Sequence, residues 1–104
     1  MKEEAIKVIR VVFKKYQIKV LKIILFGSRA RGDSEKDSDW DFLVIINKEL
    51  EFIQKREIIS EIQRELAKLK IPNDIIVKSE VQFNIMKKYV GNISYYASQE
   101  GLEV

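Results

Sequence analysis

Two apolar runs separated by a short charged stretch constrain this chain more than any other feature. VLKIILF at 20–26 is rich in β-branched residues and stops at Gly27, which is typical of a strand that ends in a tight turn. WDFLVII at 40–46 is apolar at both odd and even positions after Asp41, the pattern of a strand covered on both faces. The chain is therefore predicted to fold around a sheet with cover on each side.

Two segments with helical periodicity are predicted to form the helices that cover the sheet. Residues 3–16 place Ala5, Val8, Ile9, Val12 and Tyr16 on one face, and residues 50–69 repeat the pattern with Ile53, Ile59, Ile62, Leu66 and Leu69 before Pro72. We expect a third strand at 74–78, a helix at 79–89 opened by a capping box of Ser79 and Gln82, and a last helix at 92–101 capped by Asn92. The expected fold class is α/β (α+β), a small sheet flanked by helices, in a single domain spanning 1–104.

The amino-acid composition limits the kinds of catalytic and metal sites that this chain can form. The 104 residues include no cysteine and no histidine, which excludes thiolate and imidazole metal sites, so any catalysis must rest on carboxylates. The net charge of +3 is too small to indicate a specific nucleic-acid partner. No apolar run reaches the roughly 20 residues of a membrane span and no secretion signal is present, so a cytoplasmic protein without a membrane partner is expected.

The charged stretch closes on two aspartates, Asp39 and Asp41. Side chains alternate along a strand, so these carboxylates are predicted to project the same way, while Trp40 points to the opposite side. Close carboxylates repel unless a cation lies between them, and oxygen ligands alone favour Mg²⁺ or Mn²⁺. The alternative is a pair of hydrated acids at the exposed start of a strand.

The same stretch begins with Gly27 and Ser28. Glycine allows backbone to approach a ligand closely, and the serine adds a hydroxyl donor, so the turn suits a phosphate. Taken alone, Gly-Ser is an ordinary turn. A phosphate-binding turn beside a carboxylate pair, however, is the combination that a metal bound to a polyphosphate requires.

The complete stretch, GSRARGDSEKDSDWD, resembles the signature of the DNA polymerase beta-like nucleotidyltransferase superfamily, and of the minimal nucleotidyltransferases in particular. The resemblance implies a mixed sheet flanked by helices, two Mg²⁺ ions, ATP or another NTP as donor, and transfer of a nucleoside monophosphate to a hydroxyl. It implies that Gly27 and Ser28 hold the donor phosphates and that Asp39 and Asp41 bind the metals. Asp74, in the later strand, matches the third carboxylate of the family, a metal ligand that helps to deprotonate the acceptor. Without the resemblance, Asp74 reads as a turn residue beside Asn73.

Similar minimal proteins are commonly the antitoxins of HEPN toxins, some by attaching AMP to the toxin. The resemblance therefore implies a HEPN-type partner protein, which would supply the acceptor that so short a chain is not expected to enclose. Two alternatives stay open: nucleotidylation of a small molecule such as an aminoglycoside, and a non-catalytic module that neutralises its partner by contact. Homo-oligomers are also left open.

Other conspicuous side chains of the sequence are not expected to carry chemistry. Arg29 and Arg31 are expected to be solvated or paired with the acids of their loop. Three tyrosines near the C-terminus are expected to pack or to form an interface: Tyr89, Tyr95 and Tyr96.

Overall fold

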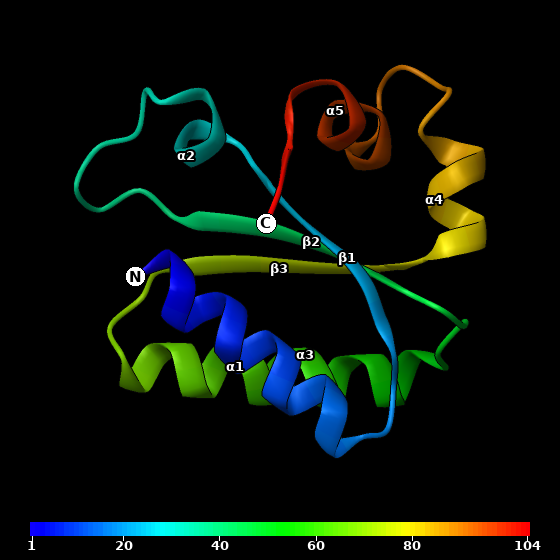
Figure 1. Ribbon diagram of the computed structural model, residues 1–104, viewed down its shortest axis with the longest axis horizontal. Helices are drawn as coiled ribbons and strands as arrows, with labels where there is room; N and C mark the ends of the chain where they lie inside the picture. The colour runs from blue at the N-terminus through cyan, green and yellow to red at the C-terminus, as the bar shows by residue number, and fades with distance from the viewer.

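The computed structural model describes residues 1–104 and consists of a four-stranded sheet between two layers of helices (Figure 1). Its elements are α1 (Lys2–Lys15), β1 (Val20–Phe26), α2 (Ser28–Arg31), β2 (Trp40–Ile46), α3 (Phe52–Lys68), β3 (Asn73–Ser79), α4 (Glu80–Met86), α5 (Ile93–Glu100) and β4 (Leu102–Glu103). The fold class predicted from the sequence is confirmed. No helix is long and apolar enough to cross a membrane.

The sheet is mixed, with strand order β3-β2-β1-β4. β1 pairs antiparallel with β2 and with β4, whereas β2 and β3 run parallel. The parallel pair is joined through α3, the crossover helix that such a connection needs. β2 is an interior strand, as predicted, and its residues 42–46 are all buried.

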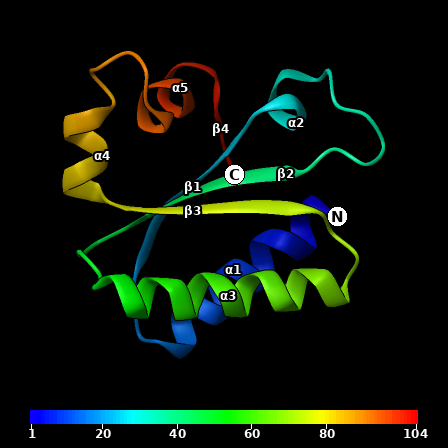
Figure 2. The ribbon, with the colours of Figure 1, turned by 180° about the vertical axis from the view of Figure 1, so that it is seen from behind.

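Alternation along the strands divides the apolar side chains between two cores. The larger core lies between the sheet and α1 and α3, which cover one face together (Figures 1 and 2). The smaller core lies on the other face under α4 and α5 and consists of Ile24, Leu43, Ile45, Phe83 and Ala97. Even positions of β2 therefore face α1 and α3, and odd positions face the layer that contains α2, α4 and α5.

The apolar face predicted for α3 was partly wrong. Ile53 and Leu69 are 71% and 47% exposed, and the buried stripe consists of Ile58, Ile62 and Leu66. Ile53 precedes Ile58 by five positions, which turns it about 140° around the helix and out of the stripe. Leu69 follows the last helical residue and caps the C-terminus of α3.

The C-terminal part of the chain differs from the expectation at two points. α4 ends at Met86, before the predicted 89, because the side-chain amide of Asn92 donates to the carbonyls of Met86 and Tyr89. The same side chain accepts the N–H of Tyr95 and caps α5 as predicted. β4 was not predicted, since two residues are too short to display an alternating pattern.

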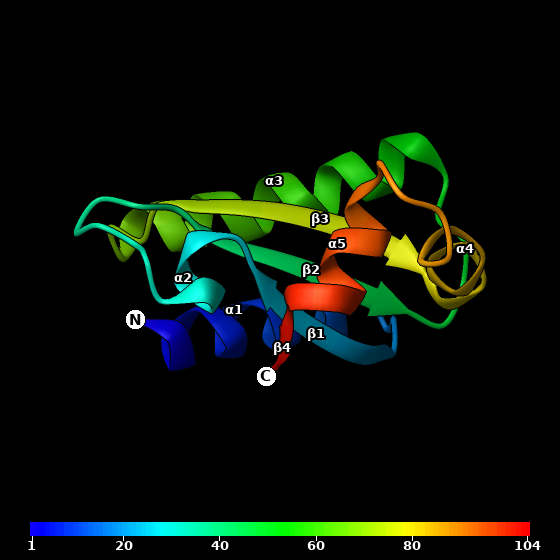
Figure 3. The ribbon, with the colours of Figure 1, turned by 90° about the horizontal axis from the view of Figure 1, so that it is seen from above.

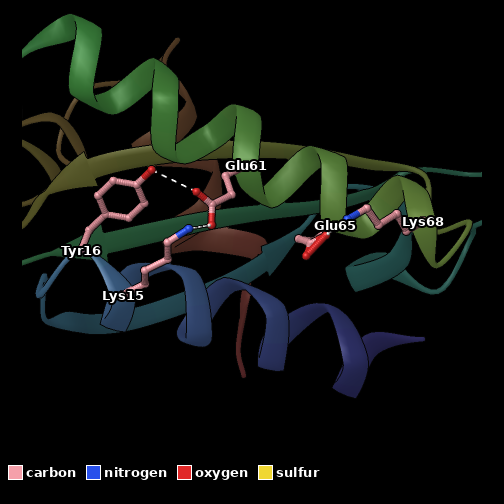
Figure 4. Close-up of polar contacts among 5 residues, drawn as sticks. All are labelled: Lys15, Tyr16, Glu61, Glu65 and Lys68. Atoms are coloured by element: carbon pink, nitrogen blue, oxygen red, sulfur yellow. Dashed lines mark hydrogen bonds and ion pairs between the residues drawn. The ribbon is translucent and has the colours of Figure 1, made fainter.

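A polar cluster ties α1 to α3 at one end of the larger core (Figure 4). The carboxylate of Glu61 accepts hydrogen bonds from Lys15 at 2.9 Å and from the Tyr16 hydroxyl at 3.0 Å. Both bonds favour the charged carboxylate and lower the pKa of Glu61. These contacts link α1 to α3 beneath the sheet that carries the candidate site.

Candidate active site

Three strands bring the candidate residues to one end of the sheet. In the register of the sheet, Asp41 on β2 lies opposite Phe26, the last residue of β1, and beside Asp74 on β3. Gly27 and Ser28 follow Phe26 directly, so the Gly-Ser turn and both aspartates meet at this end. Parallel neighbours in register point to the same face, which places the two carboxylates side by side.

The face is that of the smaller core. Asp41 lies two residues before the buried Leu43 and Asp74 lies two residues before Ile76, so each aspartate shares a face with a residue of the smaller core. Asp41 is half-buried, whereas Asp74 is exposed. Asp39 precedes β2 and is also exposed. The carboxylates therefore lie at a solvent-facing rim above a packed layer.

The electrostatics of the three acids centre on Asp41. Burial is the first cause that raises the pKa of Asp41, followed by the negative charges of Asp74 and Asp39, while Arg31 opposes the shift. Both neighbouring acids therefore act on Asp41. A cation at this position would relieve the repulsion and lower the pKa again.

The donor set fits a magnesium ion that shares its ligands with phosphates. No three acidic side chains converge in the structure as a protein-only metal cluster. Mg²⁺, however, is usually held by one or two carboxylates, with phosphates and water completing its shell. None of the hollows in the surface is lined by Asp39, Asp41 or Asp74, so the rim is open rather than enclosed.

The turn at Gly27 is built against Asp41. Gly27 has φ +74° and ψ −159°, a backbone conformation that is almost confined to glycine, and a Cβ there would overlap the Asp41 carboxylate. Ser28 begins α2, whose first hydrogen bonds run from the N–H groups of Ala30 and Arg31 to the Gly27 carbonyl at 3.1 Å. The absence of a side chain at Gly27 thus brings backbone directly against a carboxylate of the site.

Comparison with known proteins identifies the family of this chain. The family model described as "Polymerase beta, Nucleotidyltransferase" matches residues 7–96, which include the turn and all three aspartates. The chain belongs to this nucleotidyltransferase family.

Relatives agree with the assignment. The "Putative protein adenylyltransferase MJ0604" of Methanocaldococcus jannaschii is 36% identical over 83 residues, covering 79% of this chain and 78% of that protein. Two solved structures share the fold. A mutant of the toxin-antitoxin MntA-HpeT has a TM-score of 0.63 at 20% identity and covers 99% of this chain and 71% of its own. A toxin-antitoxin with AMP-PNP has a TM-score of 0.59 at 21% identity and covers 93% and 69%.

The structure also tests the predictions made for Arg31, Trp40 and Tyr89. Arg31 pairs with Asp33 at 3.3 Å, as expected, and also with Glu100 at 3.8 Å, which joins α2 to α5 beside it (Figure 3). Trp40 packs against the larger core, on the side away from Asp41, and this prediction is confirmed. Tyr89 does not pack and is 60% exposed.

The contacts of Arg29 were not predicted from the sequence. Its guanidinium was expected to be solvated or paired with an acid. It instead donates hydrogen bonds to the backbone carbonyls of Lys36 and Ser38, seven and nine residues away, and lies over the ring of Trp40. No local pattern indicates this arrangement, because every residue has a backbone carbonyl and the sequence does not mark which carbonyls accept a side-chain hydrogen bond.

Replacing Gly27 with Ala is expected to impair both stability and nucleotide binding. This backbone conformation costs a residue with a side chain about 1–3 kcal/mol, and the added methyl group would displace the Asp41 carboxylate. Gly91→Ala is the matched control, since Gly91 has φ +100° but nothing within 4 Å of its added Cβ. We expect backbone strain in both variants and loss of Mg²⁺-ATP affinity only in Gly27→Ala. Equal ATP affinities in calorimetric titrations would show that the close approach to Asp41 is unimportant.

Replacing Ser28 with Ala is expected to weaken binding of the donor phosphates with little change in melting temperature. Loss of a hydrogen bond to a charged group corresponds to about 1.5–3 kcal/mol, or roughly a 10- to 150-fold weaker affinity. Titration of the variant with ATP and Mg²⁺ measures this directly. Ser98→Ala, on the exposed side of α5, provides the control. An affinity equal to that of wild type would reduce Ser28 to a turn residue.

Proposed function

We propose that this nucleotidyltransferase is Mg²⁺-dependent and transfers AMP from ATP to a hydroxyl group on a partner protein, with release of pyrophosphate. The observation that carries the proposal is the register of the parallel strands, which sets Asp41 beside Asp74 next to the Gly27 turn. Carboxylates beside a turn open to phosphate meet the needs of phosphoryl transfer, which depends on positioning and charge neutralisation.

Each residue has a distinct role in this proposal. Gly27 and Ser28 bind and orient the donor phosphates. Asp39 and Asp41 hold the metals, for which two ions are expected, and the raised pKa of Asp41 is consistent with a position that gains from a cation. Mg²⁺, when bound, would neutralise the charge that develops on the phosphates. Asp74, at the exposed side of the pair, is a metal ligand and accepts the proton of the attacking hydroxyl.

The openness of the site supports a protein as the acceptor. The donor can be held by the metals and the Gly27 and Ser28 turn, but a small-molecule acceptor has no such hold and needs a pocket that encloses it; no surface hollow includes the three aspartates. A hydroxyl on a docked protein can reach an exposed rim. The archaeal relative named as a protein adenylyltransferase and the toxin-antitoxin structures of the same fold support this class of acceptor. We infer that the partner is a HEPN-type toxin and that this chain acts as its antitoxin. We also propose that the protein is cytoplasmic.

One observation favours a second candidate, a module that neutralises its partner by contact alone. The acidic side chains do not converge as a three-ligand cluster, which is also the arrangement expected of a site that no longer binds metal. Nucleotide binding separates the two candidates, because a contact-only module has no need of ATP.

Titration of the purified protein with ATP, GTP, CTP and UTP tests the donor half of the proposal. ATP is expected to bind in the presence of Mg²⁺ and to lose most of its affinity when EDTA removes the metal. Preference for another base would correct the donor but leave the reaction class in place. Absence of binding by any of the four nucleotides would support the contact-only module.

A further inference from the structure

The side chain of Arg29 links the two ends of the charged loop. Its Nη2 donates to the Ser38 carbonyl at 2.9 Å and to the Lys36 carbonyl at 3.1 Å. Its Cζ lies 4.5 Å from the centroid of the Trp40 ring, within the range of a cation–π contact. One guanidinium therefore connects the turn that follows β1 to the residues on both sides of Asp39.

Within residues 34–39, hydrogen bonds to α2 come from Arg29 alone. Its third and longest contact joins Nη1 to the Ser34 hydroxyl at 3.5 Å. The other bonds of the segment are internal, since the Ser38 hydroxyl accepts the N–H of Glu35 at 2.8 Å and the N–H of Ser38 reaches the Glu35 carbonyl at 3.1 Å. These internal bonds shape a small turn but do not fix its distance from Ser28.

Arg29 lies in a cluster of partly buried side chains, and some of their polar atoms are out of contact with water. Arg29 Nε, Trp40 Nε1 and Asn73 Oδ1 are buried without hydrogen-bond partners. Trp40 and Asn73 are neighbours in the register of β2 and β3, one position before the pair Asp41 and Asp74. Because side chains alternate, the cluster lies behind the two carboxylates, on the opposite side of the strands. The two carbonyls and the Trp40 ring compensate for the water that the partly buried guanidinium has lost.

We propose that Arg29 is a positioning residue of the nucleotidyltransferase, which holds Asp39 at a fixed distance from the Gly27 and Ser28 turn. This inference rests on the function proposed above. Arg29 touches neither Asp39 nor Asp41 through a hydrogen bond, and acts through the Ser38 carbonyl and the Trp40 ring. The planar guanidinium of arginine can stack on the Trp40 ring and donate to two carbonyls at the same time. The compact ammonium of lysine keeps the charge but lacks this geometry.

The variant that isolates this geometry is Arg29→Lys. Arg10→Lys, at an exposed position of α1, is the control for the same chemical change. Ile62→Val, in the buried stripe of α3, is a control for loss of stability alone, because it removes one methyl group from the larger core without touching the loop. All three variants are compared with wild type at a temperature well below their melting points.

The first readout is the loop itself and needs no ligand. Trp40 is the only tryptophan of the chain, so fluorescence quenching by acrylamide reports directly on its shielding by Arg29. Arg29→Lys is expected to increase quenching and to speed amide hydrogen exchange across residues 34–39, with β1 and α3 unchanged. Both controls are expected to match wild type in quenching and in exchange across residues 34–39. Unaltered quenching and exchange in Arg29→Lys would overturn the proposal.

The second readout is the dependence of ATP binding on Mg²⁺. Loss of an outer-shell contact that orients a metal ligand typically weakens metal affinity 10- to 100-fold, so Arg29→Lys should raise the half-saturating Mg²⁺ concentration by about tenfold or more. Ile62→Val should not change it. Equal Mg²⁺ dependence in Arg29→Lys and wild type would refute positioning while leaving the proposed function in place. If wild type binds no nucleotide, the proposed function fails, and the loop readout alone decides whether Arg29 fixes the segment.

Discussion

Asn in place of Asp41 is expected to abolish Mg²⁺-dependent binding of ATP while leaving the fold intact. The carboxylate of Asp41 is half-buried between the Gly27 turn and Asp74, where it is the most central of the three acids. The amide of asparagine has the same shape but no charge to offer to a metal. Calorimetric titration with ATP and Mg²⁺ measures the loss, and Asp37→Asn, an exposed acid of the same loop, is the control. Unchanged affinity in Asp41→Asn would exclude Asp41 as a metal ligand.

The same variant has an expected effect on stability that distinguishes lost function from lost structure. Burial and the neighbouring acids raise the folded-state pKa of Asp41 above its ordinary value of 3.8. A carboxyl whose pKa is raised by folding reduces the free energy of unfolding as the pH rises from the unfolded through the folded pKa. Asp41→Asn removes this cost. Without metal, its melting temperature should therefore exceed that of wild type at neutral pH, with a smaller difference in acid. A lower melting temperature at neutral pH would contradict the repulsion among the acids.

Replacing Asp74 with Asn is expected to stop transfer of AMP while preserving the complex with the partner. Asp74 lies at the exposed side of the carboxylate pair, so the substitution removes a metal ligand and proton acceptor but changes little of the surrounding surface. Co-purification measures the complex, and incorporation of label from α-³²P-ATP measures transfer. Normal transfer by Asp74→Asn would remove Asp74 from the reaction. Loss of the complex would show that it belongs to the docking surface instead.

The strands were predictable because their signal is local. The runs at 20–26 and 40–46 coincide with β1 and β2, since each is bounded by residues that cannot continue the strand's apolar pattern. The apolar stripe of α3 was predicted less well. Ile53 is apolar, but its position about 140° around the helix from the buried Ile58 turns it toward solvent.

The candidate site was predictable in its residues but not in its construction. The spacing of Gly27, Asp39 and Asp41 was visible in the sequence, and Asp74 followed only from the family resemblance. The contact between the Gly27 turn and Asp41, and the register that sets Asp41 beside Asp74, depend on strand pairing between distant segments. The hydrogen bonds from Arg29 to backbone carbonyls likewise form only in the folded loop.

The intact mass of the partner protein tests the central claim most directly. The product of the neighbouring gene, or a protein that co-purifies from the native host, is incubated with ATP, Mg²⁺ and either wild type or Asp74→Asn, and is then weighed by mass spectrometry. We expect the partner to gain the mass of one or more AMP groups with wild type and to gain none with the variant or with EDTA. A stable complex whose partner gains no mass under any of these conditions would contradict the account and identify a protein that acts by contact.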